Sequence, residues 1–459
     1  MDLSLLGISS PLEYIYVKIL RFALKSICYW PTELFEETTW KISKYRGLTT
    51  LTTNIFTLIS NGGYLVAKHK GLGMLEIGHM LLTVFLTASA VLPLNPKYRK
   101  IILRYFTSIH LFHHVHKSEY SKQMHIRIHK ISHLMTIFLY VQMLSGLALF
   151  NIIPIYLNYS KGKLQQKHLE NSTYELAVFM YIPRDSTTNR NSYIWVAVFD
   201  WYASYLCANS VCMNDLLLFL MIFHLYGHFK ILLNLMATLP RPAATVNQLT
   251  NTKQENQMFS EAELKDIFIR IKECIDYHNF LLDFTKAMSD AFGPMLLVYF
   301  TFQQVSCCLL LLECAQMSAE ALIRYGPLTL IIFQALIQIC FIFELIGTSG
   351  KLKDAIYELP WESMDLKNRK LVLFFLMNVQ DPIHVKAMGL TGVGVQTMAT
   401  VITLYMYIPF TLANKYFSSF MLHPCVFISY PTPDYNAKET WGPSPLFKSV
   451  RGGLINVPV

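Results

Sequence analysis

The chain has 459 residues, of which 53% are hydrophobic, 14% aromatic and only 15% charged. Soluble globular proteins carry about 25% charged residues, so the composition excludes an ordinary soluble enzyme and favours a protein with several membrane-spanning helices. The net charge of +9 fits basic cytoplasmic loops better than nucleic-acid binding. The nine cysteines have no spacing typical of a disulfide framework or a zinc site, and we expect no metal, no cofactor and no catalytic activity.

The first 46 residues are predicted to form a cytoplasmic amphipathic segment that is too charged to cross a membrane. No cleavable signal peptide is expected there. Seven apolar runs follow, each long enough for a bilayer, which needs about 20 residues. Their ranges are 47–66, 72–91, 131–155, 193–235, 292–312, 327–346 and 385–412. The sequence therefore predicts an all-α, polytopic membrane protein with seven transmembrane helices.

The distribution of Lys and Arg predicts which ends of these helices face the cytoplasm. The loop 95–130 contains eight basic residues and one acidic residue, as cytoplasmic loops commonly do. The long loop 157–192 contains two glycosylation sequons, at Asn158 and Asn171, which are expected on the outer side. Both signals place the N-terminus in the cytoplasm and the C-terminus outside.

The last part of the chain combines a basic helix with an unusual apolar run. Residues 347–382 are predicted to form a cytoplasmic segment that ends in an amphipathic helix over 366–377 and a chain break at Asp381-Pro382. The run 383–412 is rich in Gly and Thr, which favours a helix packed among other helices over one that faces lipid. Residues 413–459 contain Pro, Gly and Ser and are predicted to be an extracellular, poorly ordered tail.

Several motifs in this order resemble the insect odorant receptor family. Tyr29-Trp30-Pro31 lies where that family has a Trp-Pro pair, and Tyr181-Ile-Pro-Arg-Asp185 precedes the fourth run. The C-terminal signature stands as Pro360-Trp361, Gln380-Asp381-Pro382 and then MGLTGVGVQTMATVI. The resemblance is to a ligand-tuned subunit and not to the shared co-receptor. Pro409 and the 47-residue tail after Leu412 depart from the family pattern.

The resemblance implies a subunit of a ligand-gated, non-selective cation channel in the plasma membrane of a sensory neuron. It implies a heterotetramer with the odorant co-receptor, contacts with membrane lipid, and a small volatile ligand. The last helix of each subunit would line a central pore. The pore-gate candidates are the apolar Ile408 and Leu412, which could block ions by dewetting, together with Thr411.

The same resemblance places the odorant between the second, third, fourth and sixth helices, in the outer half of the membrane. A volatile ligand is small and mostly apolar, so aromatic and aliphatic walls with few polar groups would suffice. Helical spacing puts the three candidates of the third helix on one face. The odorant-binding candidates are Thr83, Val84, Met143, Gly146, Phe150, Tyr202, Tyr205, Gln334 and Gln338.

Seven histidines lie between His110 and His133. His125, His129 and His133 recur every four residues and so share one helical face. A metal site would need a dry, closed environment, whereas this segment is predicted to be a solvent-exposed extension of a cytoplasmic helix. A structural or interface role is therefore expected.

Two other receptor classes compete with this interpretation. A gustatory-type receptor channel is the nearest alternative, and the long second outer loop favours the odorant branch. A G-protein-coupled receptor would have its N-terminus outside, which the basic residues and sequons oppose, and the sequence lacks the Asp-Arg-Tyr and Asn-Pro-x-x-Tyr signatures. A transporter would show internal repeats, and none is visible.

Overall fold

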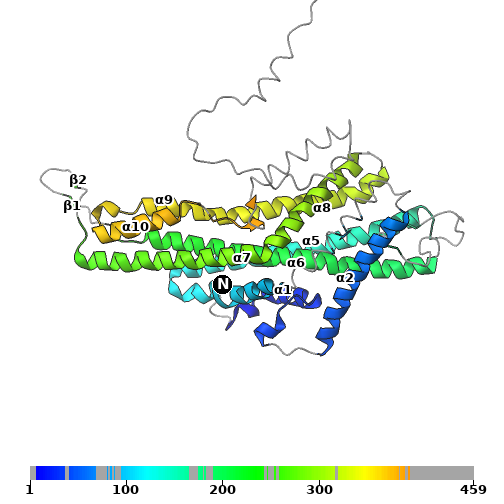
Figure 1. Cartoon of the computed structure of the whole chain (residues 1–459), viewed down its shortest axis with the longest axis horizontal. Helices are drawn as coiled ribbons and strands as arrows, with labels where there is room; N and C mark the ends of the chain where they lie inside the picture. The colour runs from blue at the N-terminus through cyan, green and yellow to red at the C-terminus, as the bar shows by residue number, and fades with distance from the viewer. Residues whose placement is uncertain are drawn as a thin grey trace, which may run out of the picture. The chain divides into compact units, whose positions relative to one another are not determined.

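The structure is a computed structural model, and helices make up most of what it describes (Figure 1). It describes residues 7–36, 41–68, 80, 83–84, 87, 95–164, 174–178, 180–181, 190–241, 245–246, 253–254, 258–315, 319–381, 383–387 and 391–392. The α-helices are α1 (Ile15–Ser26), α2 (Lys41–Lys68), α4 (Pro96–Arg104), α5 (Glu119–Ser160), α6 (Arg190–Ala237), α7 (Glu261–Ala315), α8 (Ala319–Glu344), α9 (Lys351–Tyr357) and α10 (Leu366–Asn378).

Short elements connect these helices. The short helical elements are η2 (Pro11–Glu13), η3 (Thr32–Phe35), the π-helix η5 (Tyr105–Ile109), η6 (Leu111–Lys117), η7 (Leu345–Gly350) and η8 (Trp361–Ser363). Two antiparallel ladders of minimal length pair β1 (Thr245–Val246) with β2 (Lys253–Gln254) and β3 (Lys386–Ala387) with β4 (Thr391–Gly392). Neither ladder forms a layer, so the fold is all-helical in architecture.

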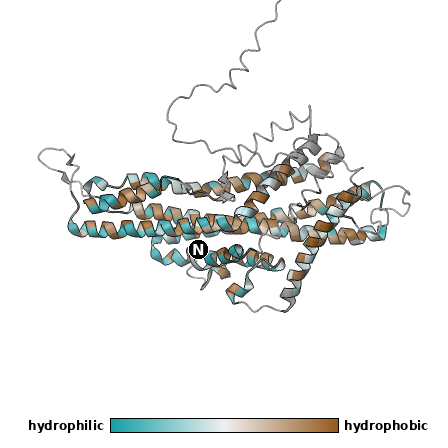
Figure 2. Ribbon diagram, viewed as in Figure 1, coloured by the Kyte–Doolittle hydropathy of each residue, from teal (hydrophilic) through white to brown (hydrophobic). Residues whose placement is uncertain are grey.

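Three described stretches are long and apolar enough to cross a membrane: α5, α6 and residues Gly326–Tyr357. The runs predicted at 131–155 and 193–235 lie inside α5 and α6, and the run at 292–312 lies inside α7. α7 starts well before its apolar run, and Figure 2 shows many hydrophilic residues along that part of the helix. The runs at 72–91 and 385–412 lie mostly outside the described residues.

Side chains and Pro at the helix starts explain where several helices begin. The Asn95 side chain accepts a hydrogen bond from the Lys97 amide at 3.0 Å, and Pro96 follows as the first residue of α4. The Ser118 hydroxyl accepts from the Ser121 amide at 3.0 Å at the start of α5. Such caps satisfy amides that have no partner within the helix.

α6 is the helix around which the described bundle packs. Of its most apolar stretch, 83% is buried, compared with 33% for the equally apolar α5. Figure 1 shows α5, α6 and α7 lying side by side, and α6 contacts α1, α5, α7, α8 and α9. A helix that is apolar on all sides is stable when neighbours cover all of its faces.

Two buried Asn side chains of α6 hydrogen-bond the segments that pack on it. Asn209 donates hydrogen bonds to the Ala23 carbonyl at 3.0 Å and to the Ser26 hydroxyl at 2.9 Å. The Asn214 side-chain oxygen accepts a short hydrogen bond from the Tyr98 hydroxyl. Buried polar groups destabilise a fold unless they find such partners, so these bonds fix how α1 and α4 lie on α6.

Histidines and tyrosines from α1, the 105–117 segment, α5 and α6 form a second set of buried contacts. His110 is fully buried, and its Nε2 lies 2.7 Å from the Tyr16 hydroxyl. Its Nδ1 accepts from the Phe112 amide, so Nε2 carries the proton and donates to Tyr16. The rings of His110 and His224 lie 4.2 Å apart. We call this set the histidine–tyrosine cluster; its members are Tyr14, Tyr16, Tyr105, His110, His125, His129 and His224.

The cluster corrects the expectation that the histidine segment is exposed to solvent. His125 is only 3% exposed, and its Nε2 lies 2.9 Å from the Tyr14 hydroxyl. Burial and the neighbouring His224 hold the pKa of His110 well below its usual 6.5. His110 is therefore neutral at physiological pH, and a neutral ring can be packed without the large desolvation penalty of a charge.

We expect Gly227→Ala to lower the stability of the bundle. A Cβ at Gly227 would lie 2.6 Å from Leu111 Cδ1 and 3.2 Å from Ile128 Cγ1, and both neighbours are buried. Overpacking of this kind costs about 1–3 kcal/mol. Thermal unfolding of detergent-solubilised protein would show a lower midpoint.

Gly62→Ala is the matched control, because a Cβ at Gly62 in α2 meets nothing within 4 Å. Its midpoint should be unchanged or higher, because Ala favours a helix over Gly by about 1 kcal/mol. Equal midpoints for the two variants would show that α6 and the 111–128 region do not pack as described.

Candidate functional site

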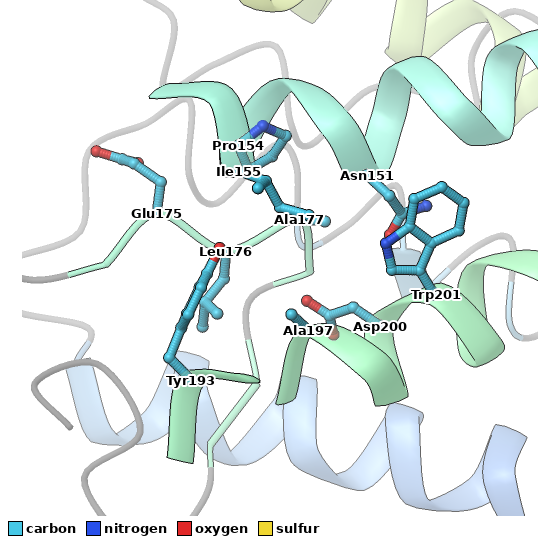
Figure 3. Close-up of a pocket in the computed structure, with 10 residues that line it drawn as sticks. All are labelled: Asn151, Pro154, Ile155, Glu175, Leu176, Ala177, Tyr193, Ala197, Asp200 and Trp201. Atoms are coloured by element: carbon cyan, nitrogen blue, oxygen red, sulfur yellow. The ribbon is translucent and has the colours of Figure 1, made fainter. Parts of the chain in front are cut away.

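A small pocket lies between the C-terminal part of α5, residues 174–178 and the N-terminal part of α6 (Figure 3). Its cavity volume is about 10 Å³, roughly the space that one buried water molecule needs. The lining residues are Asn151, Pro154, Ile155, Glu175, Leu176, Ala177, Tyr193, Ala197, Asp200 and Trp201.

Asp200 is the acidic side chain of the pocket that lies deepest, with 2% of it exposed. Its Oδ2 accepts a hydrogen bond from the Val178 amide at 3.3 Å, and the Ala177 amide also bonds this carboxyl. Its Oδ1 has no hydrogen-bond partner among the residues that the structure describes. The segment before α6 therefore holds one oxygen of the carboxyl, while the other is buried without a bond among the described residues.

Asn151 approaches the pocket from α5 and is likewise 2% exposed. Its Nδ2 donates to the Leu147 carbonyl, one turn earlier, at 2.9 Å. Its Oδ1 has no partner in the described part of the chain. Figure 3 shows Asn151 on α5 and Asp200 on α6, with Trp201 beside them. Two buried side-chain oxygens without a bond among the described residues thus line one small space whose remaining walls are mainly apolar or aromatic.

The outer rim of the pocket is held by Asn158. Its Nδ2 donates to the Glu175 carbonyl at 2.9 Å and to the Tyr193 hydroxyl at 3.0 Å, and its Oδ1 accepts from the Glu175 amide at 2.8 Å. The Tyr193 ring also stacks on Tyr174, with centroids 4.6 Å apart. These bonds clamp residues 174–178 onto α5 and α6 and so shape the pocket.

Sequence reasoning missed this site. An acidic residue within an apolar helix is a functional candidate by default, and Asp200 meets that criterion as fully as Asp215 does. Asn151 directly follows the predicted Phe150 in the sequence. It is a polar residue within an apolar helix, and that property could have identified it as a candidate. The position of residues 174–178 had no sequence signal, because it depends on contacts with two distant helices.

The predicted odorant-binding residues lie in several different environments in the structure. Phe150 packs against the small hydrophobic cluster around Tyr193, beside the pocket. Met143 is buried in the main core, and a Cβ at Gly146 would lie 3.9 Å from Ile331 Cδ1 of α8. These three α5 residues therefore follow one line from the core toward the pocket.

The other candidates are not gathered around this pocket. The Tyr205 hydroxyl lies 3.0 Å from the Ser26 hydroxyl, and Tyr202 is 44% exposed. Gln338 contacts the Met135 sulfur, and Gln334 is exposed. Thr83 and Val84 are half-buried helical residues. The gate candidates Ile408, Thr411 and Leu412 and the sequon residue Asn171 lie outside the described residues.

Comparisons with known proteins agree on one family. The family model described as 7tm Odorant receptor matches residues 98–406. The structure is similar to that of the insect olfactory receptor OR5 from Machilis hrabei, with a TM-score of 0.65, 12% identity, and coverage of 86% of this chain and 96% of that one. The structure of the same receptor in complex with eugenol gives a TM-score of 0.64 at the same identity and coverage. No curated protein matches the sequence.

The buried position of Asn158 generates a prediction about the two sequons. The Asn158 nitrogen that would carry a glycan is fully buried and makes two hydrogen bonds, so we expect this sequon to be unused in the folded protein. Ser160→Ala removes the sequon and leaves the Asn158 side chain intact, because the exposed Ser160 hydroxyl bonds only the Leu157 carbonyl. Glycosidase-sensitive gel mobility should not change.

Thr173→Ala is the matched variant for the sequon at Asn171, and any glycosidase-sensitive shift of the wild-type chain should disappear with it. A shift lost in Ser160→Ala would contradict the buried, clamping role of Asn158.

Proposed function

Because the chain belongs to the 7tm odorant receptor family, we propose that it is an odorant receptor subunit of a ligand-gated, non-selective cation channel. The observation that carries the proposal is the family match over residues 98–406, which includes α5 to α10 and most of the last apolar run. The subunit would bind a small volatile molecule and open a central pore together with an odorant co-receptor.

The pocket between α5 and α6 supports the ligand-binding part of this proposal. It is small, has aromatic walls and lies beside Phe150. Ligand pockets are commonly apolar with a few polar groups that set orientation. We propose that the volatile ligand binds along α5 from Phe150 through Gly146 to Met143, with this pocket at one end and the remaining predicted residues as further walls. The similar receptor from Machilis hrabei has been solved in complex with eugenol, a small aromatic molecule of the kind proposed here.

The exposed apolar face of α10 supports assembly with other subunits. Leu373, Phe374 and Met377 are 58%, 58% and 68% exposed, while Val372 and Phe375 on the opposite side are buried. A contiguous apolar surface of this kind commonly marks a protein–protein contact. In the proposed channel, residues 347–382 form the cytoplasmic anchor through which the subunit joins the co-receptor in a heterotetramer.

Topology and gating complete the proposal. Seven helices would cross the plasma membrane of a sensory neuron, with residues 1–46 in the cytoplasm and 413–459 outside. Residues 383–412 would line the pore, and Ile408, Thr411 and Leu412 would close it. The ligand shifts the equilibrium toward the open pore only to the extent that it binds the open arrangement more tightly.

Co-expression with an odorant co-receptor tests the proposal. Whole-cell recordings should show odorant-evoked, non-selective cation currents whose odorant selectivity depends on this chain. Cells with the co-receptor alone are the control and should not show that selectivity. Absence of odorant-evoked current with both subunits at the cell surface would contradict the channel role.

A further inference from the structure

We propose that the outward face of α1 binds anionic lipids of the inner leaflet, with Phe22 among the acyl chains and Lys18 at the phosphates. The inference rests on the proposed function in one respect, because the proposed topology sets the depth of α1 in the membrane. It goes beyond that function by naming a partner for a segment that takes part neither in ligand binding nor in the pore.

The outward face of α1 combines apolar and basic side chains. Its members recur at intervals of three or four residues and so share one side of the helix; they are Ile15, Lys18, Phe22 and Lys25. Ile15 and Phe22 are 62% and 68% exposed, and Lys18 is exposed as well. The opposite side of α1 packs into the main core. Helices with large exposed apolar side chains beside basic ones are typical of segments that lie at a membrane surface.

The proposed topology sets the inner boundary of the membrane along α6. The fourth apolar run begins at its outer end, at residue 193, and about 20 helical residues cross the bilayer core. The inner boundary of the core then lies near Met213. Asn209 is on the membrane side of that level. His224, whose ring lies 4.2 Å from that of His110, is on the cytoplasmic side.

α1 runs across this boundary. Near its C-terminal end, the Ala23 carbonyl accepts a hydrogen bond from Asn209 at 3.0 Å. Near its N-terminal end, the Tyr16 hydroxyl lies 2.7 Å from Nε2 of His110. These two contacts fix both ends of the helix on the bundle. The helix therefore passes from the cytoplasmic surface into the inner leaflet, with its outward face toward the surroundings of the bundle.

Charge selects the class of lipid. Residues 15–26 contain three basic residues and no acidic one. Glu13, which precedes the helix, already accepts a hydrogen bond from the Ser9 hydroxyl at 2.6 Å. Phe22 adjoins Ala23 and so reaches the acyl chains, whereas Lys18 lies one turn closer to the cytoplasm, at the level of the phosphates. An anionic inner leaflet attracts each basic residue near its surface about fivefold, so lipids with a net negative charge should gather there.

A photoreactive side chain at the centre of this face tests the contact directly. Phe22→p-benzoylphenylalanine keeps an aromatic ring and bonds covalently to its nearest neighbour when it is irradiated. The purified full-length chain is placed in nanodiscs of phosphatidylcholine with a minor fraction of phosphatidylserine, and the adducts are identified by mass spectrometry. We expect lipid adducts in which phosphatidylserine is enriched over its share of the bilayer. Lys18→Gln in the same chain should lower that enrichment about fivefold.

Two matched variants on α7 control for position and for charge. Ile269 is 48% exposed and lies about 35 Å along the helix before the apolar run that starts at residue 292. Ile269→p-benzoylphenylalanine should therefore give no lipid adduct. Lys272 is exposed and lies about 30 Å before the same run, beyond the screening length of about 8–10 Å. Lys272→Gln combined with the photoreactive residue at position 22 should leave the enrichment unchanged.

Absence of lipid adducts at position 22, adducts there with a second copy of the chain only, or equal lipid adducts at positions 22 and 269 would overturn the lipid contact. Phosphatidylserine adducts in proportion to the bilayer, or equal losses of enrichment in Lys18→Gln and Lys272→Gln, would overturn the selectivity for anionic lipid. Failure of the proposed function is distinguishable, because these adducts form without channel activity. A chain that gives the expected adducts but no odorant-evoked current with the co-receptor would retain the lipid surface and reject the channel role.

Discussion

The burial of the middle of α6, residues 213–232, is the constraint on which the rest of the structure depends. A helix that carries Asp200, Asn209, Asn214 and His224 would be unstable against lipid, because the bilayer core offers these groups no hydrogen bonds. Neighbouring segments must therefore supply partners along its length. α1 and α4 do so in one half through Ala23 and Tyr98, and residues 174–178 do so at the other end through Val178.

The polar groups near the two ends of α6 are accommodated in different ways. In the histidine–tyrosine cluster the polar groups are neutral aromatic rings that pack on one another and hold α1 against α5 and α6. At the pocket, Oδ2 of Asp200 is hydrogen-bonded and Oδ1 is not, within the part of the chain that the structure describes. The first arrangement packs α1, α5 and α6 firmly together. A ligand that binds along α5, as proposed, can bias the bundle only if the elements that transmit its effect are firmly packed in this way.

Much of the helical fold could be predicted from the sequence, because long apolar runs such as 131–155 and 193–235 have few alternatives to a membrane helix. The central position of α6 could not be derived from hydropathy, since α5 is equally apolar and far less buried. The polar residues within α6 were the available signal. The burial of His110 and His125 was misjudged because charge-bearing neighbours indicated an exposed helix, whereas the partners Tyr14 and Tyr16 lie about a hundred residues away in sequence. The pocket was missed for the same reason, since residues 174–178 join it through tertiary contacts alone.

The proposed topology places the pocket at the outer end of the transmembrane bundle and the histidine–tyrosine cluster at its inner end. Cysteine labelling with a membrane-impermeant maleimide tests it most directly, with wild type as the background. Tyr159, beside the pocket, is 67% exposed, and Lys100, near the cluster, is exposed on α4. The account predicts that Tyr159→Cys is labelled in intact cells and Lys100→Cys only after permeabilisation. The reverse pattern, or labelling of both in intact cells, would contradict it.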